Sequence, residues 1–393
     1  MLMRTIEHQL ARQPAVVLSG PRQVGKTTLA HEIARARSSV YIDLESPQDL
    51  ASIEDFTSFF EINKGRLIVL DEVQRKPDVF AEIRGLIDAE RRAGRRQGLF
   101  LFLGSASLDL LRQTSETLAG RVAFSELFPV NVIEIAGQDG DEIGGSIETL
   151  WLRGGFPESV LSSDDRDSLT WRQDFIRSYL ERDIPMFGGR VPAETLRRLW
   201  TMLANNQGET LNVANLARAL EIRSATVNRY IDLMTDLLLV RRLQPWAANA
   251  GKRLVKSPKV YVRDSGIAHA LLGVGDWNSL LGHPVSGGSW EGFVIENLMS
   301  VAPPLTQSWF YRATGGSELD LILQPTPGEV WAIEIKRSAA PRVSRGFHVA
   351  SEDVSATRKI VVYSGNRDYR MKGDIDVLSL RSAMEQLGGK GQS

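Results

Sequence analysis

The stretch Gly20-Pro21-Arg22-Gln23-Val24-Gly25-Lys26-Thr27-Thr28 decides the fold class, because it contains the pattern G-x-x-x-x-G-K-[ST] of a phosphate-binding loop. Gly20 and Gly25 allow a tight turn that directs backbone N–H groups toward a phosphate. Lys26 can reach the β- and γ-phosphates of a nucleotide, and the Thr27 hydroxyl can ligate Mg²⁺. This stretch therefore predicts a binding site for ATP and Mg²⁺, the alternative being an ordinary glycine-rich turn.

The segments around this loop favour a parallel sheet. Residues 15–18 form an apolar run typical of a buried strand, and residues 27–36 are expected to form a helix whose N-terminus faces the anion. Further strands are expected at residues 40–44 and 99–105, alternating with helices. Alternating strands and helices predict a parallel sheet with right-handed crossovers.

A second motif indicates nucleotide hydrolysis as well as binding. The largely apolar strand expected over residues 66–72 ends in Asp71 and Glu72, which places both acids at the carboxyl end of a buried strand. Asp71 is expected to hold Mg²⁺ through its water shell, and Glu72 to polarise the attacking water as a general base. The alternative is a solvated strand end.

Other polar residues are candidates for roles beside the γ-phosphate. Arg121, or alternatively Arg182, is expected to neutralise charge there, unless it forms a structural ion pair. An arginine supplied by another copy of the chain would imply a homo-oligomer. Ser105 or Ser107 is expected either to sense the γ-phosphate or to cap a helix.

The composition bounds the class of protein. A chain of 393 residues is expected to form two to three domains, and its net charge of −1 restricts any nucleic-acid site to a local patch. The absence of cysteine excludes a disulfide framework and thiolate metal ligands, and it suits the cytoplasm. Apolar runs are far too short to span a membrane, and the expected first strand leaves no room for a signal peptide. We therefore expect a cytoplasmic protein without a membrane partner.

The middle of the chain is typical of a winged helix. Ser224 can cap the third of three expected helices. The apolar residues of that helix, such as Val227 and Ile231, fall on one face, which leaves Arg223 and Arg229 facing outward. The expected elements are helices over residues 195–203, 213–220 and 224–234, then β-rich stretches over residues 238–243 and 253–262.

A basic run overlaps this segment. Residues 241–263 contain seven basic residues and no acidic residue, a composition that suits contacts with the phosphates of DNA or RNA. Alternatively the segment packs against the ATPase, or its basic strand contacts nucleotide or a protein partner. The expected nucleic-acid contacts are Arg223, Arg229, Lys252, Arg253 and Lys256.

The C-terminal part carries a D…ExK spacing that resembles the core of PD-(D/E)xK nucleases. Glu334 and Lys336 project to the same side of an expected strand, Asp320 on a neighbouring strand can meet them, and Glu291 lies on an expected helix. The carboxylates and the Ile335 carbonyl would form an oxygen site suited to Mg²⁺, beside which Lys336 could orient a water. The alternative is a half-exposed sheet with a surface ion pair.

From about Arg4 to Leu380 the chain resembles the bacterial and archaeal AAA-like ATPases that carry a C-terminal domain of uncharacterised function related to PD-(D/E)xK nucleases. The resemblance implies ATP binding and hydrolysis. One departure is Leu103, where the family usually has threonine. The matching motifs are residues 20–28, 41–45 (Tyr-Ile-Asp-Leu-Glu), 70–75 (Leu-Asp-Glu-Val-Gln-Arg), 104–107 (Gly-Ser-Ala-Ser), 118–121 (Leu-Ala-Gly-Arg), 179–184 (Tyr-Leu-Glu-Arg-Asp-Ile), 255–261 (Val-Lys-Ser-Pro-Lys-Val-Tyr), 318–322 (Glu-Leu-Asp-Leu-Ile) and 333–336 (Ile-Glu-Ile-Lys).

We therefore expect an α/β protein that acts as a Mg²⁺-dependent ATPase on nucleic acid. The alternative is an ATP-driven regulatory or signalling switch that binds a protein partner and has a non-catalytic C-terminal domain. The expected domains are a P-loop AAA-like ATPase core (1–135), a helical lid or connector (136–192), a winged helix (193–264), a PD-(D/E)xK nuclease-like α/β domain (265–385) and a disordered tail (386–393).

Overall fold

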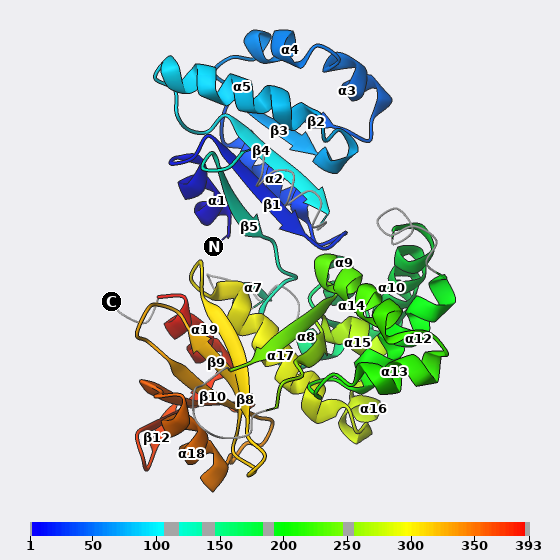
Figure 1. The fold of residues 1–393 in the computed structure, drawn as a ribbon, viewed down its shortest axis with the longest axis vertical. Coiled ribbons are helices and arrows are strands. Elements are labelled where there is room, and N and C mark those ends of the chain that lie inside the picture. Colours follow the sequence, from blue (N-terminus) through cyan, green and yellow to red (C-terminus); the bar gives the residue numbers. More distant parts are fainter. Residues whose placement is uncertain (1, 106–117, 136–145, 184–191, 247–254, 390–393) are drawn as a thin grey trace. The chain divides into compact units, whose positions relative to one another are not determined.

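The computed structural model describes residues 2–105, 118–135, 146–183, 192–246 and 255–389 (Figure 1). The chain divides into two compact units. The first contains residues 1–128 and 236–238, and the second contains residues 129–235 and 239–393. In the described ranges, no helix is long and apolar enough to cross a membrane.

The first unit is built on a parallel sheet with the strand order β2-β3-β4-β1-β5. Its strands are β1 (Ala15–Gly20), β2 (Ser39–Asp43), β3 (Leu67–Asp71), β4 (Phe100–Ser105) and β5 (Val122–Glu126). Its helices are α1 (Leu2–Leu10), α2 (Lys26–Arg35), α3 (Pro47–Ser52), α4 (Phe56–Ile62), the short η1 (Val73–Arg75) and α5 (Val79–Arg92). The parallel sheet expected from the sequence is thus confirmed, with β5 as an additional strand.

The central strands are buried on both faces, as their apolar runs predict. Val16 packs in one cluster with residues of α1 and α2, whereas Val17 packs in another with residues of α4 and α5. Since successive side chains of a strand point to opposite faces, helices cover both sides of the sheet. This packing holds the carboxyl ends of β1 and β3 at one edge of the sheet.

The second unit has a mixed sheet with the strand order β12-β13-β11-β10-β9-β8-β6-β7. Its strands are β6 (Val240–Pro245), β7 (Lys259–Val262), β8 (Gln307–Arg312), β9 (Glu318–Gln324), β10 (Trp331–Lys336), β11 (Arg358–Tyr363), β12 (Tyr369–Met371) and β13 (Ile375–Ser379). Its helices are α7 (Val132–Ile135), α8 (Ile147–Arg153), α9 (Pro157–Val160), α10 (Asp165–Ser178), η2 (Tyr179–Asp183), α12 (Ala193–Asn205), α13 (Val213–Leu220), α14 (Ser224–Asp236), α15 (Ser265–Leu271), α16 (Trp277–Gly282), α17 (Ser286–Val301), α18 (Arg345–Asp353) and α19 (Leu380–Leu387).

The structure divides the second unit differently from the sequence-based expectation. β6 pairs antiparallel with β7, and it also pairs in parallel with β8 through Gln244 and Trp309. The hairpin that follows α14 is therefore part of the C-terminal sheet, and the expected boundary at residues 264/265 separates no compact units. The expected tail is shorter too, because Gln386 and Leu387 belong to α19.

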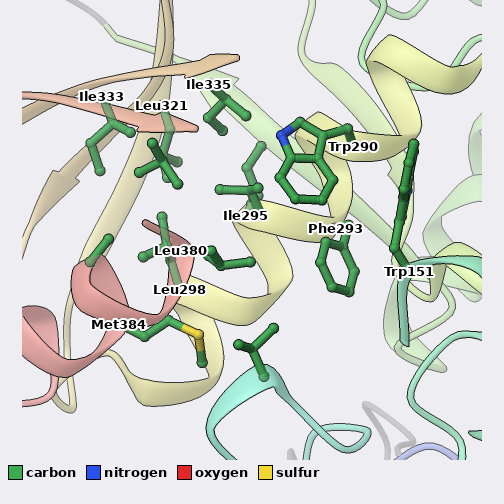
Figure 2. Packing of buried hydrophobic residues seen from close by; sticks show 14 of the residues in the cluster. Trp151, Trp290, Phe293, Ile295, Leu298, Leu321, Ile333, Ile335, Leu380 and Met384 are labelled. Atoms are coloured by element: carbon green, nitrogen blue, oxygen red, sulfur yellow. The ribbon is translucent and has the colours of Figure 1, made fainter. Parts of the chain in front are cut away.

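Helix α17 is the centre of the core of the second unit. Figure 2 shows Ile295 and Leu298 of this helix on the side of the sheet residues Leu321 and Ile333, whereas Trp290 and Phe293 lie on the side of Trp151. Burial of such large apolar side chains is the main favourable term in folding. This core fixes α17, and with it Glu291, against the sheet.

Candidate functional site

The expected phosphate-binding loop connects β1 to α2, and its two glycines serve different purposes. Gly25 has a φ of 102°, a conformation that favours glycine. A Cβ atom on Gly20 would lie 2.7 Å from the carbonyl oxygen of Leu127, so Gly20 permits a close backbone approach. The first N–H groups of α2 have no partner within the helix and suit an anion.

Lys26 lies across this loop. Its buried ammonium group donates hydrogen bonds to the carbonyl oxygens of Gly20 (3.0 Å) and Pro21 (2.9 Å). Burial lowers the pKa of Lys26 to about 8, although Glu72 and Asp71 oppose this shift. The two hydrogen bonds hold the ammonium at the loop, where a nucleotide phosphate would need its charge.

Asp71 joins the two expected motifs. Its Oδ2 atom accepts a 2.8 Å hydrogen bond from the Thr27 hydroxyl, and its Oδ1 atom accepts one of 2.8 Å from the Glu72 N–H. The Thr27 hydroxyl and the Asp71 carboxylate are oxygen donors, the type of ligand that Mg²⁺ prefers. Their proximity fits the role expected for both residues.

Glu72 follows Asp71 with a left-handed backbone conformation (φ 51°, ψ 42°). Burial raises the pKa of its carboxyl above the ordinary value, while the Lys26 ammonium opposes the shift. Its Oε2 atom accepts a hydrogen bond from the Gln74 side-chain amide. A carboxylate with a raised pKa is a better proton acceptor, which suits a general base.

Tyr41 on β2 is a site residue that the sequence analysis did not identify. Its hydroxyl donates a 2.5 Å hydrogen bond to Oδ2 of Asp71, and its ring centroid lies 4.3 Å from that of His31. Burial and the hydrogen bond to Asp71 raise the pKa of the phenol. The sequence placed Tyr41 at the start of the matching motif of residues 41–45, two residues before Asp43, which puts both side chains on one side of a strand that ends beside Asp71.

The structure does not bring Arg121 to this loop. Arg121 directly precedes β5, whose first residue pairs with Ala15 at the opposite end of β1, about 17 Å away at 3.3 Å per residue. Its guanidinium forms two 2.9 Å hydrogen bonds with the carboxylate of Asp88 on α5. A catalytic role for Arg121 remains a prediction that requires a second copy of the chain.

Ser105 pairs with Gly20 in the sheet, whereas Ser107 lies outside the described residues.

The expected nuclease residues lie together in the second unit, but with a cation from β7 among them. The Lys259 ammonium is 2.9 Å from Oε1 of Glu291 and 3.9 Å from Oδ1 of Asp320. Lys336 lies 2.6 Å from Oε1 of Glu334. Over the described part of the chain, no group of three or more acidic or histidine side chains is arranged to hold a metal ion. The residues therefore do not fit the metal site expected from their spacing.

The pKa values of the ionisable groups in this cluster are shifted by burial and by neighbouring charges. Burial, together with the nearby Asp320, raises the pKa of Glu291 to about 7 and that of Glu334 to about 7. Burial lowers the pKa of Lys259, but the carboxylates of Glu291, Asp320 and Glu318 together raise it above its ordinary value. Lys259 is thus held as a buried cation.

The basic run of residues 241–263 is not the continuous free patch that its composition suggested. Arg241 and Arg263 both donate hydrogen bonds to Glu296 on α17, and Arg242 forms a 2.6 Å ion pair with Asp232. The run contains no acid, but the fold supplies acids from other segments.

The expected nucleic-acid contacts have different surroundings. Arg223, Arg229 and Lys256 are exposed, and the Arg229 guanidinium lies 5.5 Å from the ring centroid of Tyr230. Lys252 and Arg253 lie outside the described residues.

Comparisons with known proteins agree with the fold of the first unit. Residues 12–136 match a family model described as an AAA domain, whereas residues 144–278 and 286–383 match two domains of unknown function, DUF8612 and DUF4143. The Walker-type ATPase PABY2304 of Pyrococcus abyssi superposes with a TM-score of 0.50 at 14% sequence identity, covering 69% of this chain and 94% of that one. The first unit thus matches an AAA domain and has the fold of P-loop ATPases.

Relatives extend over nearly the whole chain. The uncharacterised proteins Rv2008c of Mycobacterium tuberculosis and Mb2031c of Mycobacterium bovis are each 40% identical over 370 residues, which cover 94% of this chain and 81% of the relative. The chain belongs to the same family as these two mycobacterial proteins.

Proposed function

We propose that this protein binds ATP with Mg²⁺ at the loop of residues 20–28 and hydrolyses it. The observation that carries this proposal is the 2.8 Å hydrogen bond between Thr27 and Asp71, residues 44 positions apart. It brings the last element of the phosphate-binding loop to the acidic end of β3. Sequence spacing alone could not establish that contact.

Each residue of the site has a role that its geometry supports. Lys26 neutralises phosphate charge, and the N–H groups of the loop and of α2 orient the phosphates. Thr27 and Asp71 would hold Mg²⁺, which supplies charge neutralisation on the phosphate oxygens when bound. Glu72 accepts a proton from the attacking water on its carboxylate, which Gln74 holds in place.

Calorimetric titration with ATP and Mg²⁺ tests the binding step. The wild type is expected to bind, and Lys26→Ala to bind much more weakly because a buried ammonium at the loop is lost. Lys372→Ala is the control, since Lys372 is an exposed lysine of the second unit. Equal affinity of wild type and Lys26→Ala would contradict the assignment.

We also propose that α14 contacts nucleic acid as the recognition helix of a winged-helix arrangement. Three helices, α12 to α14, precede the antiparallel pair β6 and β7, and Glu221 forms the left-handed turn between α13 and α14. Arg223 directly precedes α14 and Arg229 lies in its second turn; both are exposed, and no ion pair involving either is present in the described ranges. Exposed, uncompensated guanidinium groups suit phosphate contacts.

The double variant Arg223→Ala/Arg229→Ala tests this second proposal. It should bind DNA and RNA of any sequence more weakly and with a flatter salt dependence, because phosphate contacts carry no base information. Arg342→Ala/Arg345→Ala makes the same change of charge at two exposed arginines elsewhere. An unchanged dissociation constant and salt slope in the first variant would favour a protein partner instead.

A further inference from the structure

The carboxylates of the C-terminal cluster already surround a cation of the protein itself. The ammonium of Lys259 lies 2.9 Å from Oε1 of Glu291, 3.2 Å from Oε1 of Glu318 and 3.9 Å from Oδ1 of Asp320. The lysine side chain is 3% exposed. These three acids come from α17 and β9, and Lys259 comes from the hairpin strand β7.

The packing of α17 against β7 fixes the ammonium at this position. A Cβ atom on Gly288 would lie 2.0 Å from the carbonyl oxygen of Gln207, and one on Gly292 would lie 3.0 Å from the Tyr261 ring. Residues 288 and 292 lie about one turn apart and flank Glu291, so this face of the helix lies close to Gln207, between α12 and α13, and to Tyr261 of β7. Tyr261, on the same side of β7 as Lys259, donates a 2.5 Å hydrogen bond to Glu291.

Every acid expected to ligate a metal here has a partner within the protein. Glu291 accepts hydrogen bonds from Lys259 and Tyr261, and Oδ2 of Asp320 accepts one of 2.8 Å from the Ile335 N–H. Glu334 is paired with Lys336. A divalent ion needs several of these oxygens at once and close to it, where the buried ammonium would repel it.

We infer that Lys259 is a built-in cation that takes the place of a divalent metal, so that the C-terminal sheet does not bind Mg²⁺ and does not cleave phosphodiesters by metal-assisted chemistry. The cluster then joins the hairpin strand β7 to α17 and β9. This inference corrects the metal site expected at Glu291, Asp320, Glu334 and Lys336, and it stands independently of ATP hydrolysis by the first unit.

Metal titration of full-length chains tests the inference. All chains carry Asp71→Asn, which removes the divalent-ion ligand expected in the first unit. Binding of Mn²⁺ is followed by electron paramagnetic resonance of the free ion, and the melting temperature is followed with Mn²⁺ and Mg²⁺. The cluster is compared in its natural form, in Lys259→Met and in Lys259→Arg, with Lys359→Met on β11 as the matched control.

With Lys259 present, millimolar metal should leave the melting temperature unchanged and no Mn²⁺ should bind. Lys259→Met should melt lower without metal, bind one Mn²⁺ ion per chain and regain stability as metal is added, since a ligand of the native state stabilises it. Lys259→Arg and Lys359→Met should remain insensitive to metal. Lys259→Gln, which keeps a hydrogen-bond donor, replaces Lys259→Met if the latter does not fold.

Two results would overturn the inference. The first is metal binding with Lys259 present that Asp320→Asn abolishes. The second is a folded Lys259→Met or Lys259→Gln chain that gains no metal binding, because the lysine would then not occupy a cation position.

Discussion

The hydroxyl of Thr27 lies 2.8 Å from Oδ2 of Asp71, to which it donates a hydrogen bond. Thr27 belongs to the first turn of α2, and Asp71 is the last residue of β3. The contact places a hydroxyl and a carboxylate together at the end of the phosphate-binding loop.

Asp71→Asn should make ATP binding nearly independent of Mg²⁺. The substitution removes the negative charge but keeps a side chain of the same shape, so affinity measured in EDTA should change little. Affinity with Mg²⁺ should fall by about tenfold or more, as is typical when a metal site is damaged. Calorimetry with and without Mg²⁺ measures both values, with the exposed Asp78→Asn as control. A full Mg²⁺ effect in Asp71→Asn would exclude Asp71 as a ligand.

Tyr41→Phe should weaken the proposed Mg²⁺ site, because it removes the hydrogen bond that the Tyr41 hydroxyl donates to Asp71. Loss of a hydrogen bond to a charged group is expected to lower the free energy of unfolding by about 1.5–3 kcal/mol. The Mg²⁺ concentration for half-maximal ATP hydrolysis should rise, because Asp71 is held less firmly. Chemical denaturation and a Mg²⁺ titration check these outcomes, with the exposed Tyr369→Phe as control. An unchanged Mg²⁺ dependence would mean that the Tyr41 hydroxyl has only a structural role.

Gly20→Ala should destabilise the first unit and weaken nucleotide binding. The new Cβ atom would lie 2.7 Å from the Leu127 carbonyl oxygen, so backbone must move at a cost of about 1–3 kcal/mol. Gly85→Ala on α5 is the matched control, because its Cβ would meet no atom within 4 Å. It should be neutral or stabilising by up to about 1 kcal/mol. Urea unfolding of both variants makes the comparison, and equal stability would contradict the close approach at Gly20.

The stability of the second unit should fall in acid because of His269. Burial lowers the pKa of this histidine to about 3, and its ring lies between the Leu152 carbonyl oxygen (3.0 Å) and the Ser289 hydroxyl (2.7 Å). Below about pH 6.5 the unfolded chain binds a proton that the folded chain does not bind until about pH 3. The free energy of unfolding should therefore decrease by about 1.4 kcal/mol for each unit of pH lowered through this window.

His269→Gln is the test of this linkage. The variant should be less stable at pH 7, yet its stability should decline less steeply between pH 6.5 and pH 4. His8→Gln replaces an exposed histidine of the first unit and is the control for the substitution itself. Equal slopes for His269→Gln and wild type would show that other groups cause the acid sensitivity.

The proposed nucleotide site could be recognised in the sequence because its determinants are local. The loop of residues 20–28 and the acids after β3 each lie within a short segment, and parallel strands bring their carboxyl ends to one edge. Tyr41 was not predicted, because its role depends on β2 lying beside β3 in register. The distance of Arg121 from the loop could not be predicted either, since it depends on β5 running parallel to β1.

The charged residues of the second unit show why their ion-pair partners could not be predicted from the sequence. The basic run has no acid of its own, but Glu296 follows Arg241 by 55 positions and Glu291 follows Lys259 by 32. Charge counted along a segment says nothing about partners that only the fold supplies. The D…ExK spacing likewise identified residues that come together, but not the lysine that lies among them.

The most direct test of the central claim is steady-state ATP hydrolysis by purified wild type and Glu72→Gln, with ATP binding measured in the same samples. The wild type should hydrolyse ATP only with Mg²⁺. Glu72→Gln should bind ATP with unchanged affinity and lose turnover by about 10²–10⁴-fold, because the amide cannot accept the proton of the attacking water. Turnover by Glu72→Gln at the wild-type rate, or no Mg²⁺-dependent hydrolysis by the wild type, would contradict the account.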